Sequence, residues 1–426
     1  MSNISWIIGK REDLLWFIGS VIMSYIFLSI YYGLNYFTNA SFAVSSLVIY
    51  LLWTILFDAT HIFATYTRTY FDKDFRQRNA RLIYGGLALL LIGPLYMMLF
   101  YYIGTQEQYR AAFLVFNRFG LLYAYYHLIR QHWGFIALYN KKNGTASPTQ
   151  IKLESIVLWS GTIYPLIYHH IHYYLPVSLA EKLSSAISFN DWIFICKVFL
   201  FIFVVLRLFY FIFKDNSLKI ISLYISNIFL ISPIVIFITI YFRIDQCLTV
   251  LLLSSAIVFA LSLTSYLGYL VNNRDKLRSA LPKLLVLSLV LFTNNFILSL
   301  KMPYITAFAC MTVFHNIQYH AIIRFHNKNK YLNNESKFGL ASVLTKNILM
   351  FAFLALSFNL VFTIPRTIIE NINIHEFLIY FSTTIIWGVA FHHYVLDAII
   401  WRPSRDSDVK LNLNLTNNGQ DLVVVK

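Results

Sequence analysis

The sequence predicts an all-α protein that crosses a membrane about twelve times and keeps both termini in the cytoplasm. Hydrophobic residues make up 58% of the chain and charged residues only 12%, which is about half the charged share of a typical soluble domain. Apolar runs of roughly 20 residues, the length that a spanning helix needs, recur along the chain. Lys and Arg gather in alternate connecting segments.

Twelve apolar runs predict the spans, and "FTNNF" makes the ninth run the least apolar. These runs place residues 1–402 in a transmembrane helical domain and residues 403–426 in a short cytoplasmic polar tail. The runs lie near residues 14–35, 43–66, 82–104, 111–139, 152–175, 191–213, 218–242, 246–271, 280–300, 303–325, 340–365 and 377–401.

The positive charges predict the orientation. With the N-terminus in the cytoplasm, alternating spans leave 25 of the 34 Lys and Arg residues inside, 5 outside and 4 within spans. Such a bias is typical of multi-pass proteins. Removing one span would move every later connecting segment to the other side and so mix the inside and outside charges. The net charge of +15 is then explained by a cytoplasmic face against anionic membrane lipid, so no nucleic acid is expected as a partner. Plain spans without a transit peptide favour a bacterial inner membrane, although a protein of the endoplasmic reticulum could have the same pattern.

Ionisable side chains concentrate in four runs that all point inward. Because such side chains are costly in hydrocarbon, they usually mark function. Since the four runs place them at a similar depth in the inner half of the membrane, we expect them to converge on one polar or metal site. They are Asp58, His61, His127, Arg130, His132, His315, His320, His392, His393 and Asp397.

Helical spacing limits which of these residues act together. Positions five apart differ by about 140° in direction, so His315 and His320 cannot both point at one ion, although a wide or two-metal site could use both. The same holds for His127 and His132. Asp58 and His61, like His393 and Asp397, share a helix face and could be two ligands, or a ligand and the group that orients it. Only one of His392 and His393 is expected to face the site.

Several chemistries fit such a cluster. Imidazole binds iron, copper, zinc and nickel, and with carboxylates in a membrane it favours non-haem iron, whereas two facing histidines could hold haem b. A proton relay in a twelve-span secondary transporter is another alternative. Arg130 could instead pair with Asp58 or Asp397 for structure alone.

Short motifs resemble two families of membrane iron enzymes. Histidines near the cytoplasmic ends of helices resemble the boxes of di-iron desaturases and alkane hydroxylases, although HxxxxH occurs twice here in place of HxxxH and HxxHH. "DATHIFAT" and "FHNIQYH" are similar to signatures of the Brp/Blh carotene dioxygenases over about fifteen residues, without their Pro-His-Gly. That resemblance implies one iron, held by residues such as His61, His315 and His320, and dioxygen attack on an apolar substrate.

The leading hypothesis is therefore a membrane-embedded, histidine-ligated oxidoreductase or oxygenase acting on a lipid-like substrate. Asp58, Asp397 and Arg130 are its candidate catalytic residues. Polar stretches such as "TYTRTYFDKDFRQRNAR" at the inner ends of the spans could bind an anionic head group or an electron-donor protein. The candidate metal ligands are His61, His127, His132, His315, His320, His392 and His393.

The remaining histidines are expected to lie elsewhere. His169, His170 and His172 in "YHHIHYY" fall near the outer surface, as an interfacial belt or as a second metal or haem site. His326 and His375 are expected in solvated loops.

Overall fold

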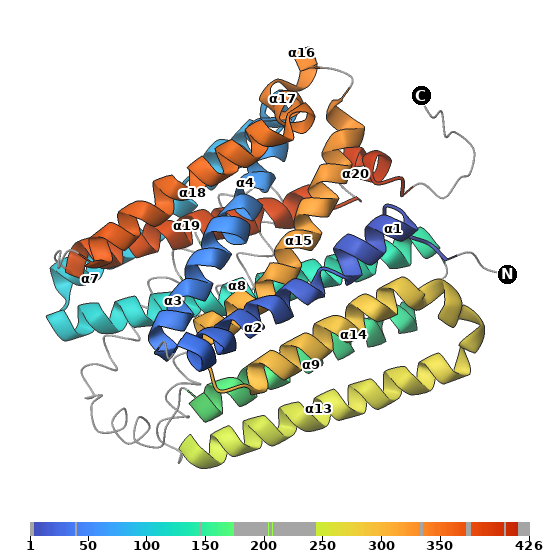
Figure 1. Ribbon diagram of the computed structural model, residues 1–426, viewed down its shortest axis with the longest axis horizontal. Helices are drawn as coiled ribbons and strands as arrows, with labels where there is room; N and C mark the ends of the chain where they lie inside the picture. Colours follow the sequence, from blue (N-terminus) through green and yellow to red (C-terminus); the bar gives the residue numbers. More distant parts are fainter. Residues whose placement is uncertain are drawn as a thin grey trace. The chain divides into compact units, whose positions relative to one another are not determined.

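The structure is a computed structural model that describes residues 4–38, 41–144, 146–173, 244–332, 335–371, 376–403 and 406–415, with the single positions 203 and 207. Helices make up the regular structure of these ranges, in which no strand occurs (Figure 1). The all-α prediction is confirmed for them. Apart from positions 203 and 207, the spans expected at 191–213 and 218–242 lie outside the described residues.

Six segments of the described chain are long and apolar enough to cross a membrane, as expected of an integral membrane protein. Each coincides with a predicted span, including the ninth, where Tyr125 donates a hydrogen bond to the Asn294 side chain at 3.0 Å. The six segments are Lys10–Thr38, Phe42–Arg68, Ala80–Ile103, Leu248–Asn272, Leu277–Ser299 and Glu376–Ile400.

These segments are built from several helices. The second contains a π-helical turn, η2, between α3 and α4. The helices are α1 (Lys10–Glu12), η1 (Asp13–Ile18), α2 (Val21–Thr38), α3 (Phe42–Trp53), η2 (Thr54–Asp58), α4 (Ala59–Arg68), α6 (Ala80–Gly86), α7 (Leu89–Ile103), α13 (Ile244–Asn272), α14 (Leu277–Ser299) and α19 (Glu376–Ile400).

Three further predicted spans are long helices that are less apolar: α8 (Gln106–Asn143), α9 (Pro148–Tyr173) and α15 (Tyr304–Tyr331). The polarity of α15 has a structural reason. Most of its side chains are buried, and it packs against α2, α3, α4 and α8. Polar residues inside such a bundle meet protein groups rather than lipid.

The predicted span 340–365 is wrong at its start. Helices α17 (Leu340–Lys346) and α18 (Ile348–Asn371) meet at a bend of 113°. Asn347 lies at the break, where its side chain accepts a hydrogen bond from the backbone N–H of Met350 at 3.0 Å. An asparagine that caps a new helix in this way favours a break over a continuous span.

Backbone contacts divide the chain into two compact units. The first contains Met1–Thr162, Leu263–Ile297 and Met302–Lys426, and the second contains Ile163–Ser262 and Leu298–Lys301. The four helices with the predicted site residues, α4, α8, α15 and α19, belong to the first unit. In this unit α19 packs along α7. The two helices approach closely at Gly93, where an added Cβ atom would lie 2.6 Å from Cβ of Thr384.

The segment expected as a polar tail contains the helix α20 (Ser407–Asn412), which packs on α15. Val409 and Leu413 are fully buried, and Asn329 donates a hydrogen bond to the carbonyl of Asn412 at 2.8 Å. The chain therefore continues to cover α15 after the last span.

Candidate metal centre

Three histidines and one aspartate converge in the first unit. One ligand atom from each of His61, His127, His393 and Asp397 lies within 4.8 Å of every other. They come from α4, α8 and α19, and each of the four residues is at least nine-tenths buried. In the described part of the chain, this is the only such group of three or more His, Cys, Asp or Glu residues.

The distances suit cis ligands of a single ion. The Nε2 atoms of His61 and His393 are 2.8 Å apart. Oδ2 of Asp397 is 3.5 Å from Nε2 of His393 and 3.7 Å from Nε2 of His127. Two atoms that each lie about 2.1 Å from an ion stand about 3 Å apart when their bonds are perpendicular. The four groups therefore need little movement to bind one metal.

His315 on α15 adds a fourth imidazole. Its ring centroid is 4.9 Å from that of His61 and 5.4 Å from that of His127. Nε2 of His127 and Nδ1 of His315 are buried without a hydrogen-bond partner, as are both ring nitrogens of His132. Since buried polar atoms nearly always have a partner, Nε2 of His127, which belongs to the converging group, fits a metal ion.

Two hydroxyl groups hold the ligands. Oδ1 of Asp397 accepts hydrogen bonds from Thr65, at 2.9 Å, and from Tyr319, which leaves Oδ2 toward the histidines. Oγ1 of Thr65 lies 2.8 Å from Nδ1 of His393. If Nδ1–H donates to Thr65, Nε2 of His393 presents its lone pair to the centre, as a metal ligand must.

Thr65 and Tyr319 were not among the predicted site residues, although their spacing in the sequence is a signal. Thr65 follows His61 by four residues, and Tyr319 follows His315 by four. Residues at this spacing share a helix face, so each hydroxyl could have been expected beside its histidine.

The local structure before His61 is unusual. The π-helical turn η2 ends at Asp58, three residues earlier. Such turns are rare and occur frequently at functional sites. Both Asp58 and His61 line the adjoining cavity.

This cavity of about 330 Å³ extends from the histidines along the helices. His61, His127, His315 and His393 lie at one end. The lining reaches residues ten or eleven positions earlier in the chain, namely Tyr50 on α3, Asn117 on α8, Ile305 on α15 and Thr383 on α19. At 1.5 Å per residue the cavity is about 15 Å long. Most of its walls between the two ends are apolar.

Three predicted ligands lie away from this cavity. His320 contacts Oγ1 of Thr60 at 3.1 Å. His392 lies between the hydroxyls of Tyr66 and Tyr70, at 3.2 and 3.1 Å. His132 is buried against Phe314, with its ring 5.9 Å from that of His315. As the 140° argument predicts, only one member of each pair five apart lines the cavity.

The two other candidate catalytic residues are placed differently. Asp58 lines the cavity but does not belong to the group of converging ligand atoms. Arg130 is exposed on α8 and does not line the cavity. Of the three candidates, only Asp397 contributes an atom to the converging group.

The expectation that His326 is solvated is wrong. It is fully buried in α15, its Nδ1 lies 3.2 Å from Oδ1 of Asn327, and its ring packs against Trp401. The reason is that α15 continues to Tyr331 and α20 packs on it. His375 lies outside the described residues.

The histidines of "YHHIHYY" each have a backbone partner. Nδ1 of His169, His170 and His172 lies 2.9 Å from the carbonyl oxygen of Leu298, Leu166 and Tyr168, respectively. Among the described residues no second group of converging ligand atoms includes these histidines, which favours the interfacial belt over a second metal site.

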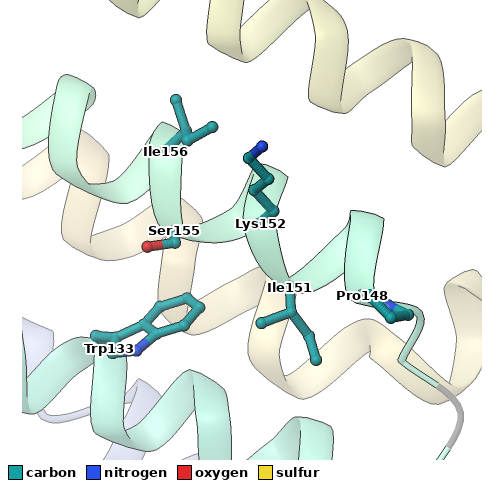
Figure 2. Close-up of a pocket in the computed structure, with 6 residues that line it drawn as sticks. All are labelled: Trp133, Pro148, Ile151, Lys152, Ser155 and Ile156. Carbon is teal, nitrogen blue, oxygen red and sulfur yellow. The ribbon is translucent and has the colours of Figure 1, made fainter.

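A second hollow, of about 480 Å³, is an open surface feature between α8 and α9. Figure 2 shows Lys152 pointing away from the indole of Trp133. Its charged group does not converge with other polar groups, so the hollow has no comparable chemistry.

No protein-family model, curated protein or solved structure matches this chain. The assignment of the site therefore depends on its geometry alone.

Proposed function

We propose that the protein is a membrane-embedded oxidoreductase, of the oxygenase type, which uses a non-haem iron ion to oxidise an apolar, lipid-like substrate. The observation that carries the proposal is the convergence of His61, His127, His393 and Asp397 at one end of an apolar cavity. The proposal includes twelve spans, two cytoplasmic termini and a bacterial inner membrane.

The ligand types favour iron. Histidines with one carboxylate and open positions are typical of non-haem iron(II) oxygenases, and iron in such a site supplies one-electron and dioxygen chemistry. The chain's own residues bind the ion, hold Asp397 through Thr65 and Tyr319, and keep water from the reacting atoms with apolar walls.

The short distance between His61 and His393 argues against haem b. Two axial ligands on opposite faces of a porphyrin would be about 4 Å apart, at roughly 2 Å each from the metal. The observed 2.8 Å leaves no room for a porphyrin between them. This pair supports cis ligation of one ion instead.

An aromatic path supports an electron donor at the cytoplasmic face. The Tyr319 ring lies 4.3 Å from that of His61, and the Tyr319 hydroxyl lies 3.4 Å from Nε1 of Trp401. Arg68 stacks on Trp401 at 4.3 Å. Consecutive aromatic contacts thus connect the centre with the predicted cytoplasmic ends of α4 and α19.

Metal analysis tests the proposal. Protein purified in detergent is examined by elemental mass spectrometry and visible absorption. We expect about one iron per chain, lost in His61→Ala/His393→Ala and retained in the control variants His320→Ala and His392→Ala. Well-folded protein without metal would overturn the proposal and leave proton-coupled transport as the alternative.

A further inference from the structure

We infer that the cavity binds a neutral long-chain alcohol lengthwise, with its hydroxyl at Asp58 and Asn316 and its chain pointing away from the histidines. A long-chain alcohol is then the substrate class of the proposed oxidoreductase, and its role as a substrate rests on that proposed function. Binding of the chain does not require the metal.

The polar end of the cavity has unmatched hydrogen-bonding groups. Asn316 is 1% exposed, lines the cavity, and has no partner for its Nδ2. Asp58, which is half-buried, also lines the cavity, and its carboxylate has no hydrogen-bond or ion-pair partner among the described residues. The Asn316 amide nitrogen needs an acceptor, and the Asp58 carboxylate needs a donor. A hydroxyl supplies both roles, and so repays the cost of burying these groups.

The charge of the lining disfavours an anionic head group in the metal-free site. Among the described residues that line the cavity there is no Lys or Arg. Before a metal binds, a phosphate or carboxylate would therefore meet Asp58 without a neutralising cation, which is costly in a medium of low polarity. A neutral hydroxyl avoids this cost.

The remainder of the cavity fits a hydrocarbon chain. Its walls include Trp53, Leu121, Phe308 and Ala390. At the far end, Nε1 of Trp387 donates a hydrogen bond to Asn117 at 2.8 Å, so these two groups satisfy each other. The polar end is therefore the one next to the histidines.

Photo-crosslinking tests this inference. The probe is a long-chain primary alcohol with a diazirine near its far end, added to the purified full-length protein in detergent. We expect crosslinks in the peptides around Phe308 and Trp387. We also expect unlabelled alcohol to compete at least about five-fold better than the alkane of equal length, because only the alcohol satisfies Asp58 and Asn316. Asn316→Leu should remove this preference.

Steric variants provide the control. Ala390→Trp and Ala124→Phe fill the cavity and should abolish crosslinking, whereas Ala111→Trp, on the exposed face of α8, should not. Three results would each overturn the inference. These are labelling at the cavity no stronger than at exposed Phe292, unchanged labelling in a folded cavity-filling variant, and competition by the alkane equal to that by the alcohol.

The two proposals fail separately. Iron-loaded protein without crosslinks in the cavity would overturn the alcohol site alone. Metal-free protein that still binds the alcohol would overturn the oxidoreductase alone.

Discussion

At the residue scale, the histidines differ in what their ring nitrogens meet. His320 and His392 contact hydroxyl groups, whereas His61 and His315 each keep a buried nitrogen without a partner. His132 also keeps both ring nitrogens without a partner, so the convergence of ligand atoms, rather than an unpartnered nitrogen, separates the candidate metal ligands from the other histidines.

Thr65→Val should weaken metal binding without removing a ligand, because His393 and Asp397 lose the hydroxyl that orients them. Loss of such a partner lowers metal affinity about 10–100-fold. Competition with a chelator measures the change. Thr69→Val is the control, since the Thr69 hydroxyl bonds only the backbone of Thr65. Equal affinity in both variants would show that Thr65 has no orienting role.

The sequence could predict that His61, Asp397 and one of His392 and His393 converge, because depth and helix direction follow from the spans. It could not choose between His392 and His393, between His127 and His132, or between His315 and His320. That choice depends on how each helix is rotated in the bundle, and neighbouring helices set the rotation. The burial of His326 by α15 and α20 likewise arises from packing that no local pattern records.

At the element scale, the packing of α19 along α7 positions His393 and Asp397. Gly93→Ala should destabilise the protein by about 1–3 kcal/mol, a typical cost of overpacking, because its Cβ would lie 2.6 Å from Cβ of Thr384. Gly134→Ala is the matched control, since nothing lies within 4 Å of its Cβ. Thermal unfolding in detergent compares the two, and equal melting temperatures would show that α7 and α19 can separate without cost.

The helix α20 should respond to pH. Burial raises the pKa of Asp408, but hydrogen bonds and charges from Lys330 and Arg78 outweigh it and hold the pKa below its usual value. A lowered folded-state pKa stabilises the fold above the unfolded value of about 3.9 and loses this effect as pH falls through the folded value.

Hydrogen exchange of the α20 amides measures this dependence. We expect protection to fall below about pH 4 and Asp408→Asn to weaken α20 by about 1 kcal/mol at neutral pH. If Asp408→Asn loses protection with the same pH profile as the unchanged protein, the pH dependence of α20 belongs to another group.

At the scale of the whole molecule, the distribution of Lys and Arg predicts which ends of the helices face the cytoplasm. Cysteine placed at Lys73 or Lys410 should react with an impermeant thiol reagent only in inside-out vesicles, and cysteine at Gln108 only in right-side-out vesicles. The opposite pattern would invert the orientation and place the metal centre in the outer half of the membrane.

X-ray absorption at the iron edge, on iron-loaded protein in lipid nanodiscs, tests the central claim most directly. We predict imidazole scattering from several histidines at ligand distances of about 2.0–2.2 Å, reduced in His393→Ala and unchanged in His392→Ala. Iron surrounded only by oxygen, with the same spectrum in both variants, would contradict a histidine-ligated centre.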